Sequence, residues 1–222
     1  MVQQAMTASS ADPITIDVVS DVVCPWCYVG KHRLEKALAM MADRTFTIFW
    51  RPFQLDPTIP KEGMPRQAYL ERKFGRERLA DLHKPLIEIG EAEGIPFAFD
   101  KITRSPNTLD AHRLLRWAHE AGKQNEMADR LFALYFTEGA DIGNRDVLAK
   151  AAADVGLDAA LVSQLLGTEA DLDPVIAEIN GAQKMGITGV PTFIFAARFA
   201  LSGAHPAETI SKAIEQSSLT SR

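Results

Sequence analysis

The pattern of apolar and polar positions predicts strands near both ends of the chain. A β-branched run over residues 14–19 is typical of a strand, and the alternation over residues 44–51 predicts a second one. Between them, apolar residues recur at helical spacing over residues 31–41. A strand, a helix and a strand in this order imply a right-handed parallel crossover.

The middle of the chain has a helical pattern instead. The proline-dense segment 54–65 indicates a connection, and from there to about residue 167 the apolar residues follow helical spacing. Such a run is expected to pack as a helical bundle. The expected helices run from Pro65 to Phe74, from Arg76 to Glu93 with an interruption near Pro85, from Asn107 to Gly122, through Met127 to Gly139, from Asn144 to Gly156, and from Asp158 to Gly167.

The last fifty residues return to mixed signals. A helix is expected over residues 172–185 and a strand within the segment 187–195, where Pro191 is expected to be the first paired residue. Residues 199–201 can pair with that strand, and 207–216 predict a closing helix. We therefore expect an α/β fold in which a large helical domain is inserted into a sheet domain. The expected boundaries are 13–60 for the first part of the sheet domain, 61–170 for the insertion and 171–218 for the second part.

Both cysteines of the 222-residue chain lie in Cys24-Pro25-Trp26-Cys27, where the first strand passes into the first helix. Unpaired N–H groups at a helix start carry about half a positive charge and favour a thiolate. Pro25 suits the first turn because its missing donor would be unpaired there anyway. Cys27 follows almost one turn later, so the two sulfurs can close a small disulfide ring. Cys24 is expected to be the exposed attacking sulfur and Cys27 the shielded resolving sulfur.

Two other uses of a cysteine pair are weaker here. A structural zinc site needs four ligands, and none of the five histidines forms an H-x3-5-H pair. A permanent disulfide that closes so small a loop stabilises little. Cys-x-x-Cys within a strand-helix-strand pattern is instead typical of a redox pair.

Composition limits the partners. Apolar residues make up 46% of the chain and the net charge is −5, without a lysine and arginine cluster, so nucleic acid and anionic membranes are not expected to bind. The first thirteen residues have neither a basic nor an apolar signal region, and no apolar run approaches membrane-spanning length. We therefore expect a cytoplasmic protein, where glutathione tends to keep dithiols reduced.

Four patches together resemble a known family. The chain is similar to the DsbA-like branch of the thioredoxin superfamily, and within it to the FrnE-like cytoplasmic thiol:disulfide oxidoreductases. The likeness extends over residues 14 to about 215. The patches are Ser20-Asp-Val-Val-Cys-Pro-Trp-Cys-Tyr-Val-Gly30, Trp50-Arg-Pro-Phe-Gln-Leu55, Asn107-Thr-Leu-Asp-Ala-His-Arg-Leu-Leu115, and Gly186-Ile-Thr-Gly-Val-Pro-Thr-Phe193 with Ser202-Gly-Ala204.

This resemblance implies a thioredoxin-like fold with a large inserted α-helical domain. It also implies that Pro191 is cis and faces the cysteine pair, and that Val190 offers its backbone to an extended substrate peptide. Trp26, which stands where the founding periplasmic oxidant has a histidine, is expected to line the substrate surface. After the strand that ends at Phe195, relatives usually carry an Asn-Gly type turn, whereas this chain has Ala196-Ala197-Arg198.

Four further polar positions are candidates. Asp21 is a possible proton relay for the cysteines, or a cap of the turn. Asn107, His112 and Arg113 match a patch that lies near the bound thiol in glutathione-using relatives. Asn107 is accordingly a candidate for substrate binding. The alternative for these three is a helix cap followed by solvated helix positions.

The leading hypothesis is an enzyme that exchanges disulfides of protein substrates, with Cys24, Cys27 and Pro191 as catalytic residues. It needs no metal and no cofactor beyond its own Cys24–Cys27 disulfide, and glutathione is a candidate cosubstrate. Hydroxychromene carboxylate isomerases and kappa-class glutathione transferases resemble the chain too, but carry serine at the position of Cys24. A third hypothesis is a non-enzymatic protein-binding module whose cysteines sense oxidation.

Overall fold

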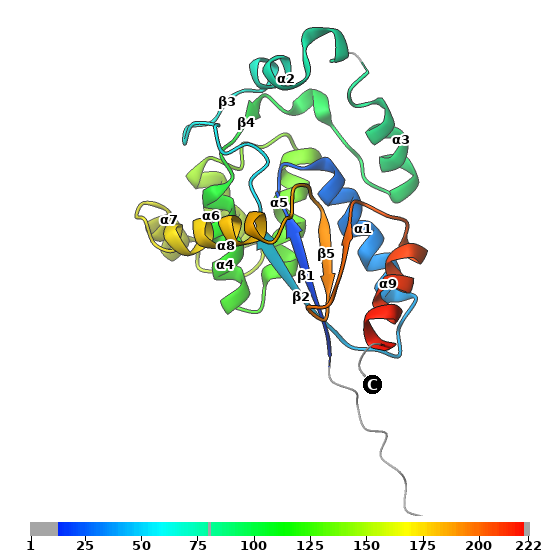
Figure 1. The fold of residues 1–222 in the computed structure, drawn as a ribbon. Coiled ribbons are helices and arrows are strands. Elements are labelled where there is room, and N and C mark those ends of the chain that lie inside the picture. The colour runs from blue at the N-terminus through cyan, green and yellow to red at the C-terminus, as the bar shows by residue number, and fades with distance from the viewer. Residues whose placement is uncertain (1–12, 80, 220–222) are drawn as a thin grey trace, which may run out of the picture.

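A four-stranded sheet forms the centre of the molecule. The computed structural model describes residues 13–79 and 81–219. The strand order is β2 (Phe46–Pro52), β1 (Ile14–Ser20), β5 (Thr192–Phe195) and β6 (Phe199–Ser202) (Figure 1). β1 and β2 are parallel, as the strand-helix-strand pattern predicted, while β5 runs antiparallel to both of its neighbours, β1 and β6.

Each face of the sheet has its own apolar layer, because successive residues of a strand point to opposite sides. Ile16 and Val18 face the larger core, together with α1 (Pro25–Ala39) and α9 (Ala207–Leu219). Val19 belongs to the other face, where it packs near Ala182 of α8 (Leu172–Lys184). Figure 1 shows α1 and α9 on one side of the strands and α8 on the other.

The helical insertion enters the chain between β2 and β5. Aromatic rings join it to the sheet domain: Tyr28 of α1 stacks on Phe132 with 5.1 Å between ring centroids, and Trp50 of β2 meets the same ring edge-on at 5.9 Å. Tyr28 is thus a core residue. The helices of the insertion are α2 (Arg66–Phe74), α3 (Lys84–Glu93), α4 (Leu109–Glu120), α5 (Gln124–Phe136), α6 (Arg145–Asp154) and α7 (Ala159–Leu166).

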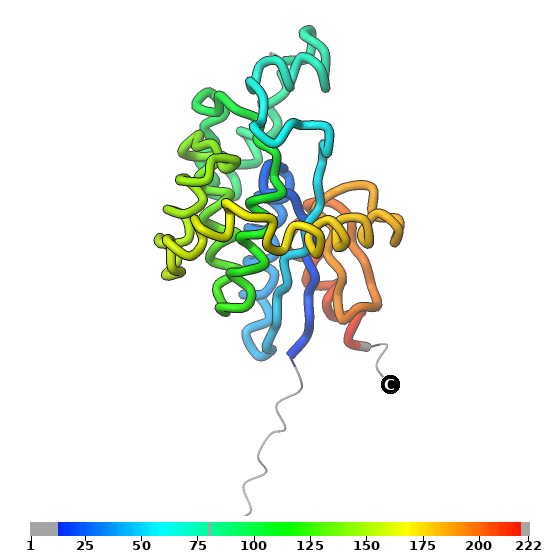
Figure 2. Tube along the Cα trace, turned by 90° about the vertical axis from the view of Figure 1, so that its left-hand side faces the viewer, coloured from blue at the N-terminus to red at the C-terminus, as the bar shows by residue number. Residues whose placement is uncertain are grey.

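The first part of the insertion lies beyond the end of the sheet at which β1 finishes. Figures 1 and 2 both show residues 56–105 above that end, over the first turn of α1. This part contains two 3-10 turns, Arg76–Arg78 and Phe99–Lys101, and a two-residue pairing of β3 (Met64–Pro65) with β4 (Arg104–Ser105). The pairing was not predicted from the sequence.

Several boundaries differ from the expectation. The helix expected over 76–93 is broken into a 3-10 turn and α3, with Pro85 in the first turn of α3, where proline is tolerated. The helix expected over 107–122 was expected to be capped by Asn107, but in α4 Thr108 occupies the N-cap. The strand expected within 187–195 begins only at Thr192, after Pro191, which has no N–H to pair.

Two helix caps agree with the sequence. Asn144 and Asp158 each accept hydrogen bonds from two backbone N–H groups of the helix that follows. The boundaries at residues 60 and 170 between sheet domain and insertion stay a prediction.

Candidate active site

The cysteine pair lies at the carboxyl end of β1, in the turn that starts α1. Cys24 is the N-cap of α1, with extended backbone angles (φ −90°, ψ 113°), and Pro25 opens the helix. The N–H of Cys24 donates to the carbonyl of Asp21 at 2.9 Å, and the carbonyl of Cys24 accepts from the N–H of Cys27 at 3.0 Å. The backbone therefore fixes both cysteines at the positive end of the helix.

Both sulfurs are free thiols. Burial is the main cause that raises the pKa of the Cys27 thiol well above its ordinary value, followed by the hydrogen bond and the charge of Cys24. The hydroxyl of Ser20 and the backbone N–H of Asp21 act in the opposite direction. The Cys27 thiol thus keeps its proton as long as Cys24 is not bound to a substrate.

The expectation that Cys24 is exposed is wrong for this conformation. Its exposed fraction is 4%, against 1% for Cys27. The reason is the loop before β5, because the Cys24 thiol donates to the carbonyl oxygen of Val190 at a distance of 3.7 Å. The Val190 loop therefore covers the Cys24 sulfur in this conformation.

The peptide bond between Val190 and Pro191 is cis, as the resemblance implied. Pro191 is buried against the first turns of α1. Gly30 makes this contact possible, since a Cβ atom there would lie 2.8 Å from the Cγ atom of Pro191. The absence of a side chain at Gly30 thus lets the helix and the proline loop close around Cys24.

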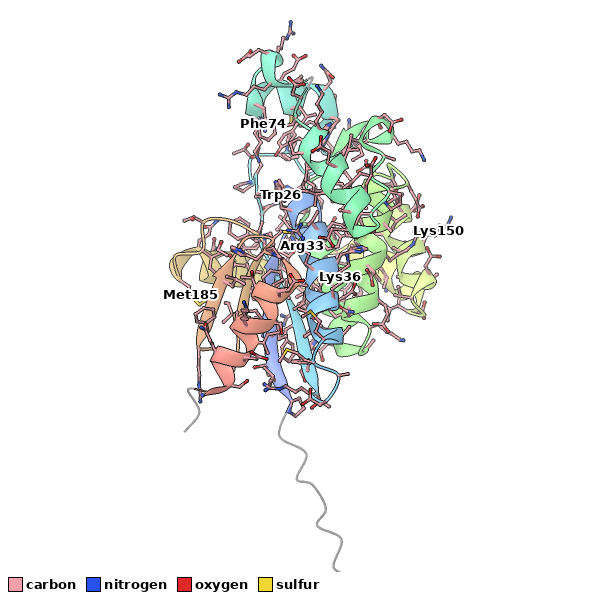
Figure 3. All side chains as sticks on the ribbon, turned by 90° about the vertical axis from the view of Figure 1, so that its right-hand side faces the viewer. Trp26, Arg33, Lys36, Phe74, Lys150 and Met185 are labelled. Atoms are coloured by element: carbon pink, nitrogen blue, oxygen red, sulfur yellow. The ribbon has the colours of Figure 1, made fainter. Side chains whose placement is uncertain are left out.

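Trp26 lies at the surface between the two cysteines in sequence. It is 40% exposed, which is unusual for a tryptophan. Figure 3 shows it projecting at the start of α1, on the same side of the helix as Arg33 and Lys36. Arg33 and Lys36 both form ion pairs with Glu93 of α3. Trp26 is the apolar residue of this row, and its side chain remains accessible to a partner.

Asp21 is buried directly before the cysteine turn. One carboxylate oxygen accepts from the N–H of Leu55 at 2.8 Å. The other has no hydrogen-bond partner and lies 3.6 Å from Nε2 of His112, which in turn contacts the carbonyl of Phe53 at 2.9 Å. The Asp21 carboxylate therefore faces the segment after β2, and the role of Asp21 as a proton relay stays a prediction.

Asn107 and Arg113 are occupied by structural hydrogen bonds. The Asn107 amide accepts from Gln54 and from the N–H of Leu109, and donates to the carbonyl of Ile59. It thereby ties the segment after β2 to the start of α4. Its predicted role in substrate binding stays a prediction.

Arg113 is 1% exposed. Its guanidinium donates to the carbonyls of Ala170, Leu165 and Thr168 and pairs with Asp110 at 2.7 Å. The alternative of a solvated helix position is wrong for this residue, because α4 buries it against the connection from α7 to α8.

Ser20 is the site residue that the sequence reasoning missed. It is 3% exposed and its hydroxyl acts on the Cys27 sulfur. A signal was available, since Ser20 is the polar third member of the inward row that Ile16 and Val18 begin.

Within the part of the chain that the structure describes, no group of three or more His, Cys, Asp or Glu side chains is placed to hold a metal ion. The two cysteines thus lack, among those residues, the further ligands that a tetrahedral zinc site requires. No helix in the described ranges is long and apolar enough to cross a membrane.

Comparison with known proteins agrees with this geometry. The profile of the DSBA-like thioredoxin domain matches residues 15–215. The chain belongs to this family. It is 30% identical over 182 residues to the uncharacterized protein YwbO of Bacillus subtilis (strain 168), with 82% of this chain and 86% of that protein covered.

Solved structures place the chain among DsbA-like oxidoreductases. The probable DsbA oxidoreductase SCO1869 from Streptomyces coelicolor has a TM-score of 0.85 at 33% identity, with 94% of this chain and 91% of that one covered. The cytosolic disulfide reductase DsbM from Pseudomonas aeruginosa, solved with GSH, has a TM-score of 0.63 at 20% identity, with 93% and 96% covered. The second likeness concerns the fold alone.

Proposed function

We propose that this DsbA-like protein is a thiol:disulfide oxidoreductase that acts on protein disulfides, with Cys24 as nucleophile and Cys27 as resolving thiol. The observation that carries the proposal is the arrangement of three parts: Cys24 at the N-terminus of α1, Cys27 buried behind it, and the Val190 carbonyl 3.7 Å from the Cys24 sulfur. Trp26 and Val190 are the proposed contacts for the substrate peptide.

The reaction has two exchange steps. The Cys24 thiolate attacks one sulfur of the substrate disulfide, a mixed disulfide forms, and the first substrate thiolate leaves and takes up a proton. Cys27 then attacks the sulfur of Cys24, the Cys24–Cys27 bond forms, and the second substrate thiol departs with the proton that Cys27 gave up. The substrate is reduced by two electrons and the protein is oxidised.

We also propose that this cycle runs in the cytoplasm with glutathione as cosubstrate. Two glutathione molecules would restore the dithiol and leave as glutathione disulfide, so that the balance of thiols and disulfides is kept. The cytosolic reductase with a related fold and bound GSH supports this assignment. Glutathione reductase and NADPH in the assay would report it as substrate-dependent NADPH oxidation.

Reduction of insulin and isomerisation of a scrambled protein substrate test the function. We expect Cys24→Ser to abolish both activities and Cys27→Ser to accumulate mixed disulfides. The Cys24–Cys27 reduction potential, fixed by glutathione titration, decides between net reduction and net oxidation. Tight glutathione binding without thiol exchange would favour a glutathione-dependent isomerase or transferase, and protein binding without exchange a redox sensor.

A further inference from the structure

The row of inward-facing residues on β1 ends in a polar side chain. Ile16, Val18 and Ser20 alternate along the strand and therefore point to the face that α1 covers. The first two positions are filled by aliphatic side chains in the core, and the third holds a hydroxyl opposite the first turn of α1. Its backbone is fixed by the hydrogen bond from the N–H of Phe53 to its carbonyl at 3.0 Å.

The Ser20 hydroxyl has no structural task. It is buried and makes no hydrogen bond of normal geometry with any described residue. A buried hydroxyl in that state weakens the fold relative to an aliphatic side chain. Stability therefore does not account for a serine at this position.

Cys27 packs in the same core cluster as Ile16 and Val18, the face of β1 to which Ser20 also points. Among the influences on the Cys27 thiol, the Ser20 hydroxyl lowers its pKa and so favours the thiolate. The second group with that effect is the backbone N–H of Asp21. In the reduced site burial raises the pKa of the Cys27 thiol, so Cys27 still holds its proton and its sulfur is a weak hydrogen-bond acceptor. Once Cys24 is tied up in a mixed disulfide, Cys27 must give up this proton to react.

We propose that Ser20 is the hydrogen-bond donor that stabilises the Cys27 thiolate during resolution of the mixed disulfide. In this step the Cys27 thiolate forms a bond to the Cys24 sulfur, the bond between Cys24 and the substrate sulfur breaks, and the departing thiol carries away the proton. The hydroxyl turns toward Cys27 in that step and, with the Asp21 N–H, replaces the solvent that the buried sulfur lacks. This inference rests on the proposed function.

A disulfide reagent that releases a coloured thiol separates the two steps. With Ellman's reagent, the attack of Cys24 releases one thionitrobenzoate and the resolution by Cys27 releases a second, so stopped-flow absorbance gives both rates. In Ser20→Ala we expect the first rate to stay within about twofold and the second to fall about tenfold, the scale of a lost hydrogen bond to a charged group. The pH midpoint of the second rate should move to higher pH.

Ser105→Ala is the matched control. Ser105 is also buried with a hydroxyl that lacks a hydrogen bond of normal geometry, but it lies beside Tyr135 rather than a sulfur. Both of its phases should equal those of the native protein. Equal slowing in Ser105→Ala and Ser20→Ala would overturn the proposal, as would an unchanged second phase in Ser20→Ala.

A second pair covers the case in which Ser20→Ala does not fold. Ser20→Thr and Ser20→Val have the same shape and differ in the hydroxyl, so the threonine variant should resolve faster and at lower pH than the valine variant. Equal second phases in the two would contradict the role of the hydroxyl. If the native protein itself released no coloured thiol, the proposed function would fail first, and this inference with it.

Discussion

Buried polar side chains serve different ends on the two sides of α4. On the side toward α7 and α8, Arg113 satisfies three carbonyls and one carboxylate. On the side toward the end of β1, the described residues include five buried polar atoms without hydrogen-bond partners. These belong to Ser20, Asp21, Arg66, Ser105 and Thr108. Fully bonded polar groups hold the insertion together, whereas the incompletely bonded ones include Ser20 and Asp21, directly before the cysteine turn, where chemistry needs donors and acceptors.

The largest expected loss of stability comes from removing the hydrogen bonds of Arg113. Arg113→Met would leave three carbonyls and the Asp110 carboxylate without their buried donor, so we expect the free energy of unfolding to fall by about 3 kcal/mol. Urea denaturation measures it. Arg116→Met is the control, because Arg116 forms partly exposed ion pairs with Asp171 and Glu178 and should lose at most about 1 kcal/mol. Equal losses in the two variants would contradict the comparison.

Tyr135 is hydrogen-bonded, and it lies beside Arg66 and Ser105, two of the residues that carry unbonded polar atoms. Burial raises its pKa to about 12, from an ordinary value of 10.0. The unfolded phenol ionises first as pH rises, so the stability that is present below pH 10 is lost between pH 10 and about 12, by about 2–3 kcal/mol.

Tyr135→Phe should remove this alkaline loss. Urea denaturation at pH 9 and 11.5, with the cysteines joined as a disulfide to exclude their titration, measures it in both proteins. An identical decline in the phenylalanine variant would show that another group titrates.

The contact between α1 and the proline loop can be changed without touching a polar group. Gly30→Ala places a Cβ atom 2.8 Å from Pro191, so the loop must shift, and we expect a loss of about 1–3 kcal/mol together with a slower first phase with Ellman's reagent. Gly181→Ala in α8 meets nothing within 4 Å and should instead stabilise by about 0.5–1 kcal/mol. A neutral Gly30→Ala would mean that the loop is not held by this contact.

The smallest effect on stability is expected at Asp21. One of its carboxylate oxygens has no hydrogen bond to lose, and an asparagine can keep the bond from the N–H of Leu55. Asp21→Asn should therefore stay within about 1 kcal/mol of the native protein. If Asp21 relays the proton, the same variant slows resolution and changes its pH profile; an unaltered profile would remove it from the reaction.

Local signals predicted much of the fold. Helical spacing, the caps at Asn144 and Asp158, and the strand pattern before Cys24 gave the main elements, because each depends on residues that are close in sequence. The pairing of β3 with β4 was missed because it joins two-residue segments about forty positions apart. Their short length leaves no periodicity to detect.

The site was predictable in its chemistry and less so in its surroundings. Cys-x-x-Cys at a strand-to-helix junction identified the reacting atoms. The burial of Cys24 could not be foreseen, because it depends on the Val190 carbonyl from the other end of the chain. The roles of Ser20 and Arg113 likewise depend on tertiary neighbours rather than on their own sequence context.

The position of β1 between β2 and β5 has a consequence for biosynthesis. Its parallel neighbour is made soon after it, but the loop that covers Cys24 lies 166 residues further along. At ordinary elongation rates this separation corresponds to roughly ten seconds or longer on the ribosome. During that interval the nascent chain carries its dithiol without the cover that the finished protein provides.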